Sequence, residues 1–308
     1  MKFVALRKIA VTVAAGIATL GVAACRPAPV DTTPPPTGWT LVGGDEFNST
    51  SLDTTKWQAY HNTYGDGNNE FACLTPSNVT VSSGTLKIRS KQEAVSCPGG
   101  KARNYTSGFI GSREVGKYYT RYARFEIRAK VPHAQGLWPA FWLRHRNGAS
   151  VAEVDVMEYF HSQVPGKSTG TLHLDGRHNL TKKSIWFEDP ATIDSGWHNW
   201  AVEIAPDSGG VKFDFFVDGN LYLTYLDTQH NWASGAEEGS WDMAINQAVG
   251  GNWGGDPDGV LGELPLVNRC AIGGTYPGGC KTTGIQRVDW NDAADATYEI
   301  DWVRVYVR

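Results

Sequence analysis

The stretch Glu153-Val154-Asp155-Val156-Met157-Glu158 places three carboxylates in six residues of an otherwise apolar segment. In a β-strand, alternate side chains point to opposite faces, so Glu153 and Asp155 share one face and Val154 and Val156 the other. Glu158 has the wrong parity for the acidic face unless one extra residue is accommodated near Val156 and Met157, as in a β-bulge. Without a bulge, the Glu158 carboxylate would lie unpaired in the core at a large cost in free energy. The stretch therefore predicts a bulged strand with three acids on one face.

The flanking sequence predicts more strands. In residues 138–143, Trp138, Ala140 and Trp142 occupy alternate positions and would lie on one face of a strand, with Phe141 and Leu143 on the other. Alternation also runs through 119–131, through 211–217 with a turn at Asp218-Gly219-Asn220 into 221–225, and through 298–308. No long stretch after the first 24 residues has a helical period. Many alternating strands with glycine-rich connections predict an all-β sandwich of two sheets, whose concave face would form a cleft if the sheets curve.

The composition and net charge indicate which kinds of molecule the protein could bind. The chain has 308 residues, including 35 glycines, and its 12 tryptophans suit both a core and a surface that stacks on sugar rings. The formal net charge is −4, and loss of residues 1–24, with three basic and no acidic side chains, would leave −7. An acidic chain without a basic patch argues against a nucleic-acid partner.

The first 24 residues predict an export signal. Lys2, Arg7 and Lys8 precede an apolar run that ends in Val22-Ala23-Ala24-Cys25, a sequence resembling a bacterial lipobox. We expect residues 1–24 to be a lipoprotein-type signal peptide, with Cys25 lipid-anchored and 25–37 a proline-rich linker. Ordinary cleavage to a secreted protein is the alternative. Residues 38–308 form one domain, expected to be monomeric, that meets the membrane only through Cys25.

The remaining four cysteines suit an oxidising compartment. Cys73, Cys97, Cys270 and Cys280 allow three pairings, and their spacings do not match a zinc finger. Our hypothesis is the sequence-local pairing, Cys73 with Cys97 and Cys270 with Cys280.

The motifs together resemble glycoside hydrolase family 16, in particular its laminarinase-like branch of endo-β-1,3-glucanases. The resemblance rests on 136–143 (GLWPAFWL), 153–159 (EVDVMEY), and five further blocks in the family's order: 44–47 (GDEF), 67–70 (GNNE), 170–173 (GTLH), 248–253 (AVGGNW) and 300–306 (IDWVRVY). It implies a β-jelly-roll and a retaining double displacement with Glu153 as nucleophile, Glu158 as general acid/base and Asp155 between them. A retaining pair needs carboxyl groups about 5–5.5 Å apart, and acids this close cannot all ionise freely.

The same resemblance extends to the surroundings of the acids. His173 is expected near the acid/base, and the residues implied in substrate binding are Asn69, Glu70, Trp138, Trp142, Asn246 and Trp253. Catalysis needs no cofactor in this family. A structural Ca²⁺ is common, and its matching positions are main-chain carbonyls of Glu46 and Gly84 and the carboxylate of Asp301.

Some features leave alternatives open. The three acids could instead hold calcium, although a buried strand favours catalysis. Residues 144–152 carry Arg144 and Arg146 where the family often has Trp-Pro and Gly, and 264–283 resembles an insertion; loops of this kind set glycan specificity. The expected substrate is β-1,3-glucan. The alternatives are a β-1,3(1,4)-glucanase, a galactanase, a transglycosylase, or a non-catalytic glucan-binding protein.

Overall fold

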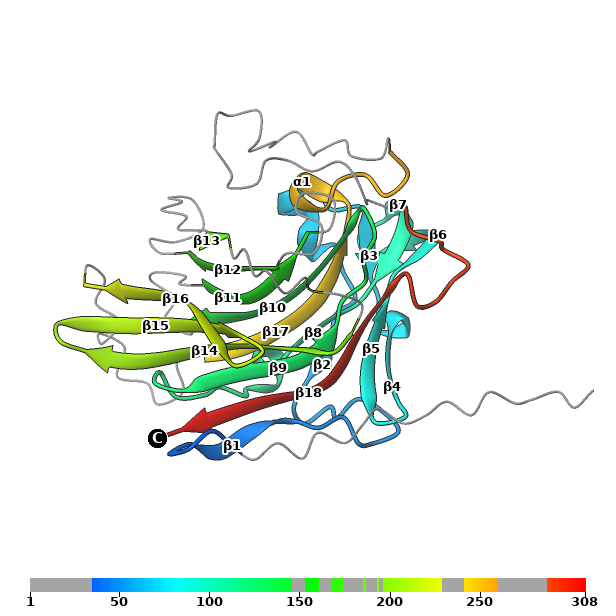
Figure 1. Cartoon of the computed structure of the whole chain (residues 1–308). Helices are drawn as coiled ribbons and strands as arrows, with labels where there is room; N and C mark the ends of the chain where they lie inside the picture. Colours follow the sequence, from blue (N-terminus) through cyan, green and yellow to red (C-terminus); the bar gives the residue numbers. More distant parts are fainter. Residues whose placement is uncertain are drawn as a thin grey trace, which may run out of the picture.

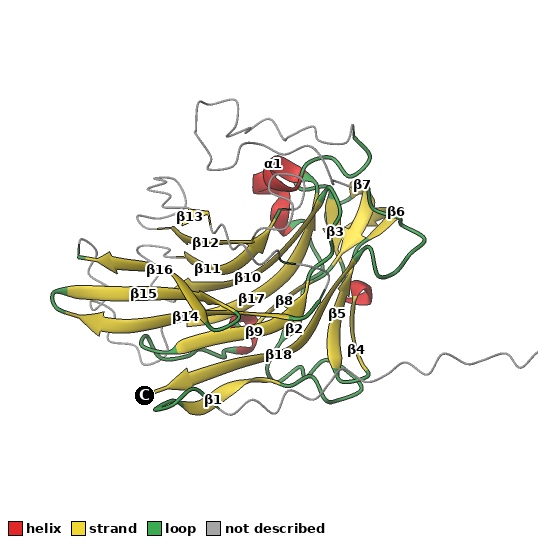
Figure 2. Ribbon diagram, in the orientation of Figure 1, coloured by secondary structure: helices red, strands yellow, loops and turns green. Residues whose placement is uncertain are grey.

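A computed structural model of the chain describes residues 35–145, 153–160, 168–173, 185–186, 193, 196–228, 241–259 and 287–308. The expected signal peptide, Cys25, and the Cys270–Cys280 pair lie outside these residues. Within them, no helix is long and apolar enough to cross a bilayer. Strands dominate the described part of the chain (Figure 2).

One layer is a seven-stranded antiparallel sheet. Its strands, in spatial order, are β13 (Ile185–Trp186), β12 (Ser168–His173), β11 (Glu153–Tyr159), β10 (Leu137–His145), β17 (Trp241–Val249), β8 (Phe109–Gly111) and β2 (Gln58–Ala59).

The second layer is an eight-stranded antiparallel sheet. Its order is β16 (Asn220–Asp227), β15 (Gly210–Val217), β14 (His198–Asp207), β9 (Arg124–Lys130), β18 (Thr297–Val307), β5 (Thr85–Arg89) and β4 (Val79–Ser82), and β1 (Thr40–Asp45) also pairs with β18. Positive φ angles at Asp218 (49°) and Gly219 (77°) make the tight turn between β15 and β16. The predicted hairpin is confirmed.

A small third sheet and four short helices complete the described structure. The sheet has the order β3 (Ala72–Leu74), β7 (Lys101–Ser107), β6 (Lys91–Cys97), with β3 and β7 parallel. A disulfide joins Cys73 to Cys97, which confirms that half of the expected pairing. The helices are η1 (Tyr64–Asn68), η2 (Pro76–Asn78), η3 (Arg113–Val115) and α1 (Gly251–Gly254).

The main core lies between the two large sheets. Phe141, Leu143 and Val154 of the seven-stranded sheet pack in one buried cluster with Phe125 and Val303 of the other. Burying such side chains stabilises the fold by roughly 1.5–3 kcal/mol each. Figure 1 shows curved strands in both layers, and the arrangement is the expected β-jelly-roll of two antiparallel sheets.

The strand expected over 119–131 is wrong at its start, because β9 begins only at Arg124. Tyr119 instead forms an isolated bridge with Trp241 of β17, in the seven-stranded sheet. Between Tyr119 and Arg124 the chain passes from the seven-stranded to the eight-stranded sheet. The alternation of apolar and polar residues therefore continues across a point where no single strand does.

Candidate active site

The acidic strand β11 carries the predicted bulge. Asp155 pairs with Trp142 and Met157 pairs with Phe141, so Val156 is the extra residue opposite two consecutive residues of β10. The pairing with β12 shifts over the same residues. Both Val156 and Met157 point into the core, at 1% and 0% exposure. Glu158 therefore returns to the side of Glu153 and Asp155, and the parity argument is confirmed.

These three acids lie on the outer face of the seven-stranded sheet, which we define as the face turned away from the main core. Cross-strand neighbours share a face, so the register gives three rows of side chains on it. The first row is His173, Glu153, Arg144 and Asp242; the second is Thr171, Asp155, Trp142 and Ala244; the third is Thr169, Glu158, Ala140 and Asn246. Glu153 and Glu158 thus flank Asp155 along one strand.

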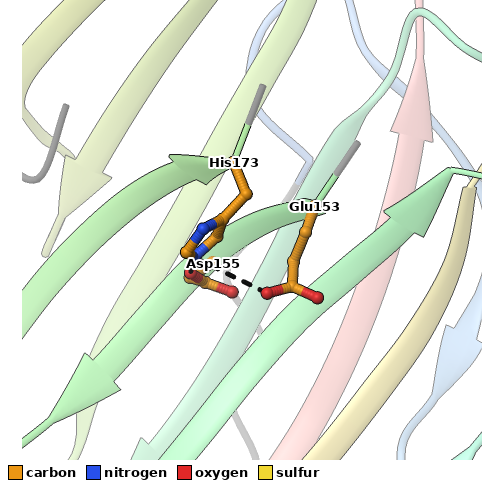
Figure 3. Close-up of side chains that lie close together, drawn as sticks. All are labelled: Glu153, Asp155 and His173. Carbon is orange, nitrogen blue, oxygen red and sulfur yellow. Dashed lines mark hydrogen bonds and ion pairs between the residues drawn. The ribbon is translucent and has the colours of Figure 1, made fainter. Parts of the chain in front are cut away.

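Glu153, Asp155 and His173 converge (Figure 3). The Nε2 atom of His173 is 2.9 Å from Oδ2 of Asp155 and 3.6 Å from Oε1 of Glu153. The Asp155 side chain is buried, whereas Glu153 and His173 are partly exposed. The imidazole on β12 therefore lies beside two carboxylates of β11. His173 was expected near the acid/base Glu158, but its direct contacts are with Asp155 and Glu153.

The carboxyl group of Glu158 has two different neighbours. The indole Nε1 of Trp138 donates to its Oε1 at 3.1 Å, and the Thr171 hydroxyl donates to its Oε2 at 3.3 Å. Ala140, opposite Glu158 on β10, is small and leaves room for the carboxyl group.

Burial raises the pKa of Glu158 to about 8, with a further contribution from the negative charges of Asp155 and Glu153; the nearby His173 and the Trp138 hydrogen bond oppose the rise. A carboxyl group with such a pKa is protonated at neutral pH and can donate a proton. The site therefore contains a neutral acid on the same strand face as the Glu153 carboxyl group, which is the pair that glycoside hydrolysis needs.

Two of the three expected substrate-binding tryptophans, Trp138 and Trp142, lie on this outer face, but most of their surface is covered, whereas Trp253 lies in α1 and is partly exposed. Trp138 and Trp142 are each 8% exposed. Trp138 packs with Phe160 (ring centroids 5.3 Å apart), and Phe160 lies 6.0 Å from Trp253. Trp142 donates its indole N–H to Asn246 at 2.7 Å. The structure thus places Trp138 beside Glu158, brings Trp253 into the same aromatic cluster through Phe160, and joins Trp142 to Asn246 in the middle of the face.

Asn69 and Glu70 lie at the end of this face, where Glu70 bridges to Gly250 just after β17. The exposed Asn69 donates to the Asn252 side chain at 2.9 Å. Burial raises the pKa of the Glu70 carboxyl group to about 7, against the hydrogen bond from Asn68. Gly65 has no side chain where this carboxyl group lies, since a Cβ there would be 1.9 Å from Oε2. The predicted pair is therefore held near α1 and Trp253.

A buried ionic cluster at the other end of the face was missed from the sequence. Arg144, opposite Glu153, binds the fully buried Asp242 through Nε (2.7 Å) and Nη2 (2.6 Å), and Arg113 binds the other oxygen of Asp242 at 2.7 Å. Arg144 also donates to the hydroxyl of Tyr60, which itself donates to Glu114. In the sequence Arg144 stands out only as a departure from the family pattern, and no local pattern links it to a residue 98 positions away.

The three expected calcium positions come from neighbouring segments. Glu46 follows β1, Gly84 precedes β5, and both strands pair with β18, which contains Asp301. However, the Asp301 carboxylate binds the Arg128 guanidinium and the Glu46 carboxylate binds Arg304. One ligand of the expected set is thus already neutralised by a cation of the protein.

One ligand atom from each of Glu153, Asp155 and His173 also lies within 4.8 Å of the others, the spacing of a metal site. Two of these three residues, His173 and Asp155, are also hydrogen-bonded to each other.

Comparison with known proteins agrees with this geometry. Residues 67–259 match the family described as "Glycosyl hydrolases family 16". The "Beta-glucanase" of Rhodothermus marinus is 31% identical over 248 residues, covering 73% of this chain and 82% of the relative. The "Glucan endo-1,3-beta-glucosidase A1" of Niallia circulans is 30% identical over 295 residues, 89% of this chain but 39% of the relative, so the chain spans about two fifths of that protein. The laminarinase catalytic domain from Thermotoga maritima MSB8 superposes with a TM-score of 0.66 at 25% identity, covering 88% of this chain and 98% of that one.

Proposed function

Because this chain belongs to glycosyl hydrolases family 16, we propose that it is a retaining endo-β-glycanase that hydrolyses internal β-linkages of a polysaccharide, with β-1,3-glucan as its substrate. The observation that carries the proposal is that Glu153, Asp155 and Glu158 share one strand face, where burial raises the pKa of Glu158 to about 8.

In the first step, Glu158 gives its proton to the glycosidic oxygen while Glu153 attacks the anomeric carbon, and a covalent glycosyl-enzyme forms as the leaving sugar departs. In the second step, water attacks the same carbon, Glu158 takes the proton of the water, and Glu153 is released. Two inversions at one carbon retain the β-configuration.

Asp155 and His173 assist Glu153 and Glu158 through charge and hydrogen bonding. The buried Asp155 adds negative charge that keeps Glu158 protonated, and His173 holds Asp155 through its hydrogen bond and lies 3.6 Å from Glu153. The negative charges of Asp155 and Glu153 thus both act on the carboxyl group of Glu158.

The substrate class rests on the names of the relatives, two of which are glucanases. The alternatives of a β-1,3(1,4)-glucanase, a galactanase or a transglycosylase keep the same two steps and differ in the glycan bound or in the acceptor. A non-catalytic glucan-binding protein would have no use for a protonated acid beside Glu153.

A substrate screen tests the proposal. Laminarin, mixed-linkage glucan, agarose and galactan are incubated with the protein, products are sized, and the first anomer formed is identified by NMR. We expect β-anomers from laminarin, and no hydrolysis by folded Glu153→Gln or Glu158→Gln. Products of α-configuration, or wild-type rates in either variant, would contradict the mechanism.

We also propose that the protein is exported, anchored through a lipid on Cys25 and monomeric; the sequence of residues 1–25 supports the first two points. Palmitate labelling that persists in Cys25→Ala would contradict the anchor. A structural Ca²⁺ near Glu46, Gly84 and Asp301 is supported by the convergence of β1, β5 and β18 and opposed by the Arg128–Asp301 ion pair.

A further inference from the structure

The two oxygens of Glu158 have chemically different partners. The indole N–H of Trp138 lies 3.1 Å from Oε1, and the hydroxyl of Thr171 lies 3.3 Å from Oε2. An indole N–H can only donate, whereas a hydroxyl can donate or accept. The carboxyl group is therefore asymmetric before any substrate binds.

This asymmetry decides where a proton sits. In a carboxylic acid the carbonyl oxygen is the better acceptor, so a donor fixed on Oε1 favours the form with the proton on Oε2. We propose that Trp138 is a positioning residue that directs the acid proton of Glu158 to Oε2, and that the Thr171 hydroxyl stabilises Oε2 once it has become charged. The inference rests on the proposed function of Glu158 as general acid/base.

The position of Trp138 suits this role better than stacking alone. Its ring is 8% exposed and is fixed between strands, since Trp138 pairs with Ala248 and packs on Phe160. A buried, packed indole loses little further entropy in holding one hydrogen bond. The sequence suggested only a stacking surface for this residue.

With the acid proton on Oε2, the path of the proton can be written for both steps of the reaction. In the first step the Oε2 proton moves to the glycosidic oxygen as the bond from that oxygen to the anomeric carbon breaks and the Glu153 ester forms. Glu158 is then a carboxylate that receives hydrogen bonds from Trp138 and Thr171. In the second step a proton of the attacking water returns to Oε2 as the ester breaks.

The test removes the N–H and keeps the ring. Trp138 is replaced by Phe and, to conserve shape, by benzothienylalanine, in which sulfur stands where the N–H was. Each variant is assayed on laminarin and on a dinitrophenyl β-glycoside of a β-1,3-linked disaccharide, whose leaving group needs no proton. The burst of dinitrophenol isolates the first step on the second substrate.

We expect about a tenfold to hundredfold loss of kcat/KM on laminarin and a burst rate within about threefold of wild type. Losing a donor to the charged form also raises the pKa of Glu158, so the alkaline limb of the laminarin profile should move up by about one pH unit. Equal losses on both substrates would mean that the ring only contacts sugar, and an unmoved alkaline limb would also overturn the proposal.

Two controls complete the design. Trp142→Phe removes an indole N–H from the same strand that is bonded to Asn246 instead, so any loss should be similar on both substrates, with no shift of the alkaline limb. Thr171→Val should lower laminarin hydrolysis and Thr171→Ser should restore it; identical rates in the two would contradict the role of the hydroxyl. A wild-type protein inactive on every glycan would defeat the proposed function itself, a result distinct from any of these.

Discussion

The imidazole of His173 lies 2.9 Å from the carboxylate of Asp155, across the pairing of β11 with β12, and 3.6 Å from that of Glu153. Three groups that the sequence places on two separate motifs thus share one hydrogen-bonded cluster. The contact supports the proposed role of His173, which is to hold Asp155 between the two glutamates.

Replacing His173 tests that task. In His173→Ala, Asp155 loses its contact with the imidazole at 2.9 Å and Glu153 loses a neighbour at 3.6 Å, so we expect kcat on laminarin to fall by about tenfold to a hundredfold with little change in KM. Steady-state kinetics measure both. His173→Gln, which can still donate to Asp155, should recover part of the loss; a rise in KM alone would assign His173 to substrate binding.

The pH dependence of hydrolysis should reflect Glu158. Its pKa is raised to about 8 by burial and by the negative charges of Asp155 and Glu153. Activity that requires the protonated acid is therefore expected to fall as the pH rises through about 8. The measurement is kcat/KM on laminarin from pH 4 to 10. Glu70, whose pKa is about 7, is the control: an alkaline limb that disappears in Glu70→Gln would assign the limb to Glu70 instead.

The raised pKa of Glu158 should also make the free energy of unfolding depend on pH. The folded pKa of Glu158 lies above its ordinary value of 4.5, so its contribution to folding is complete below pH 4.5 and is lost as the pH rises through 8. Glu158→Gln does not titrate. The variant should gain on wild type between pH 5 and 8, by at most about 1.4 kcal/mol per pH unit. Urea unfolding at pH 5, 7 and 9 measures the difference, and a constant difference would contradict the raised pKa.

The Arg144–Asp242 pair should matter for stability. Burial raises the pKa of Asp242 against the charges of Arg144 and Arg113. Arg144→Met leaves a fully buried carboxylate with one cation in place of two, and we expect a loss of about 3 kcal/mol or more. Denaturant unfolding gives the value. In the matched double variant, Arg144→Met with Asp242→Asn, part of the loss should be recovered, and strict additivity would show that the two side chains are not coupled.

Calcium has a direct test. If Ca²⁺ binds near Asp301, removing it with a chelator should lower the Tm, and the drop should vanish in Asp301→Asn. Adding Ca²⁺ back should restore the wild-type Tm, because a ligand that binds only the folded state stabilises it. Equal Tm values with and without chelator would mean that the ion pair with Arg128 is the whole role of Asp301.

Local patterns predicted the parts of the site that depend on parity. The position of Glu158 on the acidic face follows from counting residues between carboxylates, and the separation of Trp138 and Trp142 from Phe141 follows from alternation. The pairing of Cys73 with Cys97 needed only the shortest loop.

Contacts between residues far apart in the sequence could not be predicted from such local patterns. Arg144 finds Asp242 only because β10 and β17 are neighbours in the sheet, and Thr171 reaches Glu158 only because the bulge shifts the register of β12. The strand expected from Tyr119 failed for a related reason, since alternation does not report that the chain changes sheets. Sequence periodicity describes one strand at a time, whereas these features need its neighbours.

The single surplus residue at Val156 makes the chemistry of this protein sensitive to length as well as to identity. Deleting one aliphatic residue there would leave every acid in the polypeptide, yet it would rotate Glu158 by half a turn of the strand into the hydrocarbon interior. A hydrolase could be silenced in this way without the loss of a functional group, so residue counts within β11 carry as much information about activity as the glutamates themselves.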